Sequence, residues 1–297
     1  MGAMPQEYRL YQDLAAWWPL ISPPGVYTAE AAYLNAVLAA APGPVRDVLD
    51  LGSGGGNVAA HLKAGRSLTL IDLSADMLAV SRELNPESDH RQGDMRTIRL
   101  GRTFDAVLVH DAVDYMTTEA DLGQVIETAW AHCRPGGIAL FVPDYTAESF
   151  RIASGHGGSS DPSGRQASFR EWTWDPDPGD GWIQSEYEFV LRDADGSVQV
   201  VSEAHRLGAF GQETWLRLLR GAGFDLEAGA ALEPDLAGPD GSADGPDEPA
   251  DGPEGSADGP EGSADGPAGS ADGPDGPDGE AAPRRPRNLF IGRRPEA

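Results

Sequence analysis

The stretch VRDVLDLGSGGGNVAAHL, residues 45–62, decides how this sequence folds. An apolar run carries the acid Asp50 near its end, four glycines follow within residues 52–56, and a helical pattern begins at Asn57. A glycine-rich turn between a buried strand and a helix lets the backbone approach a ligand closely, because no side chains intervene. The stretch therefore predicts the first strand, ligand loop and first helix of a ligand-binding α/β fold.

The spacing of the glycines separates several kinds of ligand loop. The dinucleotide fingerprint G-x-G-x-x-G fails from Gly52, because position 57 is Asn, and from Gly54, because position 59 is Ala. A P-loop is excluded because no Gly-Lys-Ser/Thr follows. The pattern that fits is Asp-x-Gly-x-Gly-x-Gly, with Asp50, Gly52, Gly54 and Gly56.

Strands and helices alternate on both sides of this loop. Apolar runs at 45–51, 67–73, 104–110 and 137–143 are typical of buried parallel strands. Helical patterns lie between them, with Ser74 placed to cap one and CRPGG (133–137) to end another. This alternation predicts a doubly wound, Rossmann-like α/β sheet.

Residues 150–206 break the alternation. Two alternating segments, SEYEFVLRD and GSVQVVSEAHR, are joined by the turn residues Asp193 to Gly196, which predicts an antiparallel hairpin. We expect a small antiparallel β insertion here, serving as an acceptor lid or a dimer contact. Residues 207–232 and 284–297 then complete the core sheet.

Residues 233–283 are low in complexity and carry 15 acids with no Lys or Arg. GSADGP occurs at 241–246, 255–260, 262–267 and 269–274. Such a segment buries too little apolar surface to offset the entropy of ordering it, so we expect a disordered acidic loop. The remaining regions are an N-terminal helical cap over the active site (1–44) and the ligand-binding core (45–149).

Composition narrows the function classes. Without residues 233–283 the formal charge of −26 becomes about −11, still acidic, which argues against a nucleic-acid partner. The single cysteine, Cys133, excludes a disulfide framework and a Cys-based metal site, and we expect no metal. No apolar run approaches the ~20 residues of a membrane span, and the start lacks a signal peptide. We expect a soluble, cytoplasmic protein that does not bind membranes.

The glycine pattern resembles motif I of the class I S-adenosylmethionine-dependent methyltransferases. Other landmarks of that family follow in order: Asp72 and Asp94, each 22 residues after the previous acid, then FDAVLVHDAVDYM, CRPGGIALF and RNLFIGRR, which suits an antiparallel last strand. The resemblance implies S-adenosylmethionine as cofactor. It implies that Asp72 binds the ribose hydroxyls, that Asp94 reads the adenine amino group, and that Met95 lies against the ring. The implied cofactor-binding set is Tyr11, Asp50, Gly52, Ser53, Gly54, Gly56, Asp72, Leu73, Met77, Asp94, Met95 and His110.

The methyl acceptor is less defined. The N-terminal segment and GDMRTIRLGRTFDAV resemble bacterial amino-sugar N,N-dimethyltransferases, which implies N-methylation of a small amine such as an amino sugar. FREWTWDPDPGDGWIQSEYEF in the insertion departs from that likeness. Alternatives are O-methylation of a small carboxylate or hydroxyl compound, a non-catalytic S-adenosylmethionine-binding protein and a nicotinamide-dependent oxidoreductase.

Candidate catalytic residues are two histidines. A neutral amine must lose a proton before or during attack on the methyl group, and a positioned base can assist. His110 ends the fourth strand and is the first candidate, with a contact to the cofactor as its alternative role. His205 in the hairpin is the second. The candidate acceptor-binding residues are Trp17, Tyr27, Asp111, Tyr115, Trp172 and Trp174, with core packing or a dimer contact as the alternative for the aromatic ones.

Overall fold

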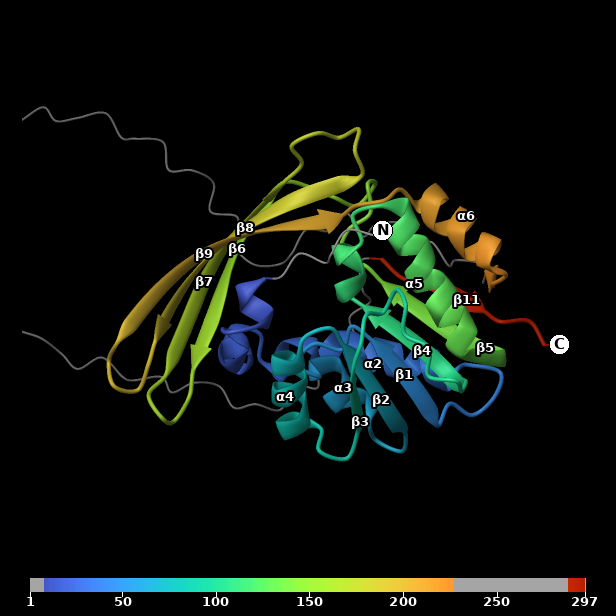
Figure 1. Cartoon of the computed structure of the whole chain (residues 1–297), viewed down its shortest axis with the longest axis horizontal. Helices are drawn as coiled ribbons and strands as arrows, with labels where there is room; N and C mark the ends of the chain where they lie inside the picture. The colour runs from blue at the N-terminus through green and yellow to red at the C-terminus, as the bar shows by residue number, and fades with distance from the viewer. Residues whose placement is uncertain (1–7, 227–287, 297) are drawn as a thin grey trace, which may run out of the picture. The chain divides into compact units, whose positions relative to one another are not determined.

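A seven-stranded sheet organises the computed structural model, which describes residues 8–226 and 288–296. The strand order is β10-β11-β5-β4-β1-β2-β3 (Figure 1). The strands are β1 (Asp47–Leu51), β2 (Ser67–Asp72), β3 (Asp89–Gln92), β4 (Phe104–His110), β5 (Cys133–Val142), β10 (Asp225–Leu226) and β11 (Phe290–Arg293). β1 to β5 pair in parallel, and β11 runs antiparallel between β5 and β10. The chain leaves β1 for β2 on one side and reaches β4 on the other, so a ligand crevice opens at their carboxyl ends.

Helices cover both faces of this sheet. The helices of the core are α2 (Thr28–Ala39), α3 (Asn57–Leu62), α4 (Ala75–Leu84), α5 (Glu119–His132) and α6 (Gln212–Ala222). Leu49 and Ile71 pack in one cluster with α5 and α6, whereas Val48 and Leu70 pack in another with α2 and α3. Successive strand residues point to opposite faces, so a sheet buried on both sides needs apolar residues at every position. The continuous apolar runs of the sequence follow from this.

A second, four-stranded antiparallel sheet has the order β6-β7-β8-β9 (Figure 1). Its strands are β6 (Ala153–Ser160), β7 (Gln166–Trp174), β8 (Trp182–Arg192) and β9 (Val198–Gly208). One face, here called the inner face, packs Phe189 and Leu191 against Leu10, Leu14 and Ile21 of the N-terminal segment. That segment consists of short helical turns, η1 (Arg9–Tyr11), η2 (Ala15–Trp17), α1 (Trp18–Ile21) and η3 (Pro24–Tyr27).

The predicted fold class is confirmed, including the antiparallel strand near the C-terminus. The predicted hairpin is β8 and β9, joined through Asp193 to Gly196. The insertion is larger than the hairpin, because β6 and β7 extend it to four strands. β6 has the sequence ASGHGGSS, which has little strand propensity, so pairing with β7 decides its conformation. The acidic repeat lies outside the described residues. Among the described residues, no helix is long and apolar enough to cross a membrane.

The ligand loop packs closely on the α4 region at Gly56, and alanine substitution there measures how much stability depends on this close packing. Gly56 and Gly65 both have left-handed backbone, with φ of 76° and 75°. A Cβ at Gly65 would meet nothing within 4 Å, whereas one at Gly56 would collide with the Ser81 hydroxyl and the Asn85 amide. We expect Gly65→Ala to lower the free energy of unfolding by about 1–2 kcal/mol, the cost of a left-handed non-glycine residue. Gly56→Ala should cost at least about 1 kcal/mol more, because the buried hydrogen bond from Asn85 to the Gly56 carbonyl must shift. Urea titration of both variants measures the difference, and equal losses would contradict this packing.

Candidate active site

A cavity of about 960 Å³ opens at the carboxyl ends of β1, β2 and β4. The inner face of the second sheet and the N-terminal segment also contribute to its wall. Most of the residues predicted from the sequence line it: Tyr11, Tyr27, Asp50, Gly52, Ser53, Gly54, Asp72, Leu73, Met77, Asp94, Met95, His110, Asp111 and Tyr115. Residues separated by more than 100 positions thus meet in one place.

The glycine loop is hydrogen-bonded to β2 and packs closely against Ala112. The backbone N–H groups of Gly52 and Ser53 both donate to the Ile71 carbonyl oxygen, at 2.8 Å. Gly52 has φ of 82°, and a Cβ there would collide with Ala112. Glycine is required at this position both for the left-handed backbone and for the close approach of Ala112.

Asp72 ends β2 and joins the glycine loop to the start of α4. Its Oδ2 accepts a hydrogen bond from the Gly54 N–H and its Oδ1 one from the Ser74 N–H, both at 2.8 Å. Burial raises the pKa of Asp72, although these two hydrogen bonds act in the opposite direction. Each oxygen keeps a further lone pair, so the carboxylate can accept two more hydrogen bonds from the cavity side.

Asp94 follows β3 and is held by Arg96. The guanidinium donates to both carboxylate oxygens, with the shortest contact 2.7 Å, and the Arg96 backbone N–H also donates to Oδ1. Burial alone would raise the pKa of Asp94, but these interactions with Arg96 outweigh it and lower the pKa. Arg96 also pairs with Asp121 at 2.9 Å, so its charge is balanced within the wall.

His110 is buried between two carboxylates. Its Nε2 lies 3.2 Å from Glu30 Oε2, and its Nδ1 lies 3.1 Å from Asp111 Oδ1. Burial alone would lower the pKa of His110, but the two carboxylates raise it well above its usual value. The two carboxylates therefore favour the protonated form of the His110 imidazole. The expected role as a free base is not favoured, since a protonated imidazole has no lone pair to accept a proton.

Asp111 adopts strained backbone at the same strand end. It is the one non-glycine residue with positive φ among the described residues, at 45°. Its N–H donates to the Val142 carbonyl at 2.9 Å, which ties the end of β4 to the end of β5. Such strain persists where the surrounding structure holds it, and it is common at functional sites.

Several buried polar atoms of the wall have no hydrogen-bond partner within residues 8–226 and 288–296. They are Asp50 Oδ1, Ser53 Oγ, Trp18 Nε1 and Asp114 Oδ1. Burial raises the pKa of Asp50 to about 7, despite the opposing effect of the His110 charge. Buried polar groups are normally hydrogen-bonded, so these donors and acceptors indicate a polar ligand.

Two tyrosines at the cavity wall are linked to His205. The hydroxyls of Tyr11 and Tyr115 lie 2.6 Å apart, and the Tyr115 hydroxyl lies 2.8 Å from His205 Nδ1. His205 is fully buried, and its Nε2 lies 3.4 Å from Glu203. His205 does not line the cavity itself, but its ring also packs against Tyr8 and Tyr187 of the wall, with ring centroids 3.9 and 4.9 Å away.

Five predicted residues do not line this cavity. Gly56 faces Ser81 and Asn85 of the α4 region, and His205 lies behind Tyr115. Trp17 packs under the Arg165 guanidinium at 4.2 Å, and its neighbour Trp18 lines the cavity instead. Trp172 and Trp174 also lie elsewhere.

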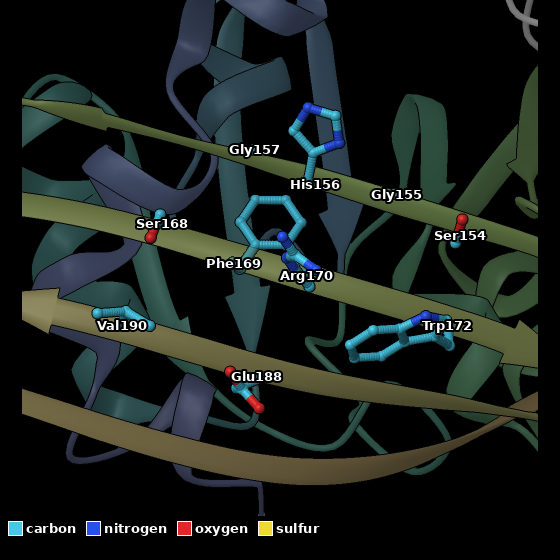
Figure 2. Close-up of a pocket in the computed structure, with 10 residues that line it drawn as sticks. All are labelled: Ser154, Gly155, His156, Gly157, Ser168, Phe169, Arg170, Trp172, Glu188 and Val190. Carbon is cyan, nitrogen blue, oxygen red and sulfur yellow. The ribbon is translucent and has the colours of Figure 1, made fainter. Parts of the chain in front are cut away.

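Strand alternation explains where Trp172 lies. Phe169 and Glu171 of β7 line the cavity, so the residues between them face the other way. Figure 2 shows Trp172 with Arg170, Glu188 and Val190 on this outer face of the second sheet, where they border a depression of about 560 Å³. Trp172 and Trp174 are two residues apart and share that register, so neither lies in the cavity wall, where the acceptor was expected to bind.

The sequence analysis missed other parts of the wall. Asp144 after β5 and Arg206 of β9 both line the cavity. No sequence spacing links Asp144 to the motifs at β1 and β2, and only the parallel pairing of β4 with β5 brings it near. The alternation of β7 could have indicated Glu171, since it shares a face with the buried Ala167 and Thr173.

The residues present fit S-adenosylmethionine. The unpartnered Asp50 oxygen suits an α-ammonium group, and the Ser53 hydroxyl and Trp18 indole N–H suit a carboxylate. Asp72 can accept hydrogen bonds from a ribose. When bound, S-adenosylmethionine supplies a methyl group on a positively charged sulfur, and the acidic wall complements that charge.

Comparisons with known proteins agree with this site. Residues 48–137 match the family described as a methyltransferase domain. A dTDP-3-amino-3,6-dideoxy-α-D-glucopyranose N,N-dimethyltransferase of Streptomyces fradiae is 29% identical over 208 residues, 68% of this chain and 78% of that protein. A dTDP-3-amino-3,4,6-trideoxy-α-D-glucopyranose N,N-dimethyltransferase of Streptomyces venezuelae is 32% identical over 126 residues, 42% of this chain and 53% of that protein.

A solved structure shows the same fold. The sugar N-methyltransferase KedS8 from a Streptoalloteichus species superposes with a TM-score of 0.66 at 21% identity, covering 100% of this chain and 96% of that one. Residues 48–137 form a methyltransferase domain, and S-adenosylmethionine is its cofactor. Among methyltransferases, the chain resembles the bacterial amino-sugar N,N-dimethyltransferases.

Asp72→Ala tests the predicted ribose contact. We expect S-adenosylmethionine to bind more weakly by roughly 1.5–3 kcal/mol, the range for a hydrogen bond to a charged group. Isothermal titration calorimetry measures this, with Asp89→Ala as the control, because Asp89 is an exposed acid of neighbouring β3 outside the cavity wall. Unchanged affinity in Asp72→Ala would place the ribose elsewhere.

Proposed function

We propose that this enzyme transfers methyl groups to the amine nitrogen of a small amino sugar. The observation that carries the proposal is the charge of the cavity wall, where Asp50, Asp111, Asp114, Asp144 and Glu171 all contribute carboxylates. Two basic residues of the same wall, His110 and Arg96, lie beside carboxylates. A wall of this kind favours a cationic amine over an acidic acceptor.

The relatives support the same acceptor class. Both curated relatives are named as N,N-dimethyltransferases of dTDP-linked 3-amino sugars. An amine that is methylated twice must present the same nitrogen in two successive reactions. We propose that Tyr27, Asp111 and Tyr115 contact the acceptor, because they line the wall beside the predicted cofactor residues.

The two predicted catalytic histidines take supporting roles in this proposal. His110 balances the charges of Glu30 and Asp111. His205 orients Tyr115 through the hydrogen bond to its hydroxyl. The cytoplasmic location and the absence of a nucleic-acid partner remain predictions from the sequence.

Methyl transfer to dTDP-3-amino-3,6-dideoxy-α-D-glucopyranose tests the proposal. The purified protein is incubated with S-adenosylmethionine and this sugar, and mass spectrometry detects one or two added methyl groups. The matched control is dTDP-6-deoxy-α-D-glucopyranose, which carries a hydroxyl in place of the amine. We expect the amino sugar to react at least about 100-fold faster, because the hydroxyl lacks the positive charge that the acidic wall favours and is a weaker nucleophile than a free amine.

Other outcomes of this assay favour the alternatives. Methylation of the hydroxyl sugar at a similar rate would favour an O-methyltransferase. Binding of S-adenosylmethionine without transfer to either sugar, or to other small amines, would favour a non-catalytic binding protein.

We also propose that the outer face of the second sheet is a contact between two copies of the chain. Trp172, Val190, Val198 and Val200 share this face and are 43%, 36%, 60% and 60% exposed. Val190 and Val200 are direct cross-strand neighbours, and exposed apolar side chains gathered on one face often mark a protein–protein contact. Arg170 and Glu188 are paired across β7 and β8 on the same face, so a twofold axis could bring each beside its opposite charge (Figure 2).

Light scattering coupled to size-exclusion chromatography tests this contact. We expect the wild type to elute as a dimer and Trp172→Glu to shift toward the monomer, because the variant buries an unpaired charge in the contact. Val26→Glu is the control, since Val26 is 68% exposed on η3, outside the second sheet. A monomeric wild type would contradict the proposed dimer.

A further inference from the structure

Asp114 lies at the end of β4, where a buried carboxylate faces the cavity. It belongs to the short helical turn η4 (Ala112–Tyr115) and is 3% exposed. Its Oδ2 accepts a hydrogen bond from the Asp144 backbone N–H at 2.9 Å, which fixes the orientation of the side chain. Its Oδ1 has no hydrogen-bond partner in the part of the chain that the structure describes, and Asp114 lines the cavity. One oxygen is thus anchored and the other is free to accept a proton or a hydrogen bond.

Charged groups from several elements surround this carboxylate. The carboxylates nearest in its electrostatic environment are Asp144 after β5 and Asp111 after β4, with His110 as the neighbouring cation. Burial and the two carboxylates raise the pKa of Asp114 well above its usual value, and the His110 charge opposes this only in part. Around Asp144 the further charged groups are Glu30 of α2 and Glu171 of β7.

The environment of Asp114 suits a catalytic base, whereas the environment of His110 does not. An ordinary carboxylate is too weak a base to take a proton from an ammonium group readily, because their pKa values lie far apart. A raised carboxylate pKa narrows that gap, and general-base efficiency rises as the gap narrows. Both ring nitrogens of His110 lie beside carboxylate oxygens, whereas Asp114 Oδ1 has no hydrogen-bond partner among the described residues, so Asp114 is better suited to accept a proton.

We propose that Asp114 is the catalytic base that accepts the proton of the acceptor ammonium. This inference rests on the amine acceptor of the proposed function. The acceptor enters as R–NH₃⁺, and one N–H proton passes to Asp114 while the electron pair of that bond stays on nitrogen. The nitrogen then forms the bond to the methyl carbon, and the donor sulfur keeps the electron pair of the bond that breaks. The product is R–NH₂⁺–CH₃, which must lose a proton in the same way before a second transfer.

The variant Asp114→Asn distinguishes a catalytic base from a residue that only maintains the structure of the site. The asparagine carbonyl can still accept the hydrogen bond from the Asp144 N–H, so the cavity geometry is retained. With the amino sugar that the wild type methylates, we expect kcat near neutral pH to fall by about 100-fold or more, the usual contribution of a general base. The loss should shrink below about 10-fold at a pH above the pKa of the amine, because the free amine then needs no base.

Two controls accompany this variant. Calorimetry should give an unchanged affinity of Asp114→Asn for S-adenosylmethionine, which shows that the donor side of the site is intact. Asp89→Asn, an exposed acid outside the cavity, should keep the wild-type rate at every pH. A pH–rate profile of Asp114→Asn parallel to that of the wild type would overturn the proposal and leave the amino-sugar function standing.

Asp144→Asn provides a second test that keeps Asp114 in place. Removing the neighbouring negative charge lowers the pKa of Asp114. A base with a lower pKa stays ionised to lower pH, so the acid limb of the pH–rate profile should move to lower pH. An acid limb that stays in place or moves to higher pH would contradict the assignment, whatever the rate of the variant at neutral pH.

Discussion

β1 is hydrogen-bonded in parallel on both sides, and the rest of the structure depends on this constraint. Its two neighbours are β2 and β4, and helices cover both faces, so Val48, Leu49 and Leu51 are almost fully buried. Polar groups are therefore concentrated where the parallel strands end. Asp50, Asp72 and His110 collect there, and the glycine loop is held to β2 by two hydrogen bonds to the Ile71 carbonyl.

The acids of this region are all at least partly buried, but their pKa values differ because their neighbours differ. Asp94 is paired with Arg96 and has a lowered pKa, whereas Asp50 and Asp114 are buried with unpartnered oxygens and have raised pKa values. His110 is charged because two carboxylates flank it. The same residue types thus serve as an ion-pair partner, ligand-facing acceptors and a buried cation, according to their neighbours.

The two faces of the second sheet lie in different environments, one at the cavity and one exposed. Its inner face packs on Leu10, Leu14 and Ile21, and Phe169, Glu171 and Tyr187 of that face reach the cavity wall. Its outer face carries Trp172 and exposed valines. Because strand residues alternate, neighbouring positions of β7 belong to different environments, and one sheet can close an active site while leaving an apolar surface outside.

Local sequence patterns were enough to predict the doubly wound fold, the antiparallel last strand and most of the residues that line the cavity around the glycine loop. Those features depend on local periodicity and on motifs at fixed spacing, which a sequence displays directly. Only the tertiary structure decided which of Trp17 and Trp18 lines the cavity, that Trp172 faces outward, and that His205 is buried behind Tyr115. It also brought Asp144 beside Asp114 through the pairing of β4 with β5, and it placed His110 between Glu30 and Asp111, which raise its pKa. Strand register, packing and desolvation arise between segments that are distant in the chain, so no local pattern encodes them.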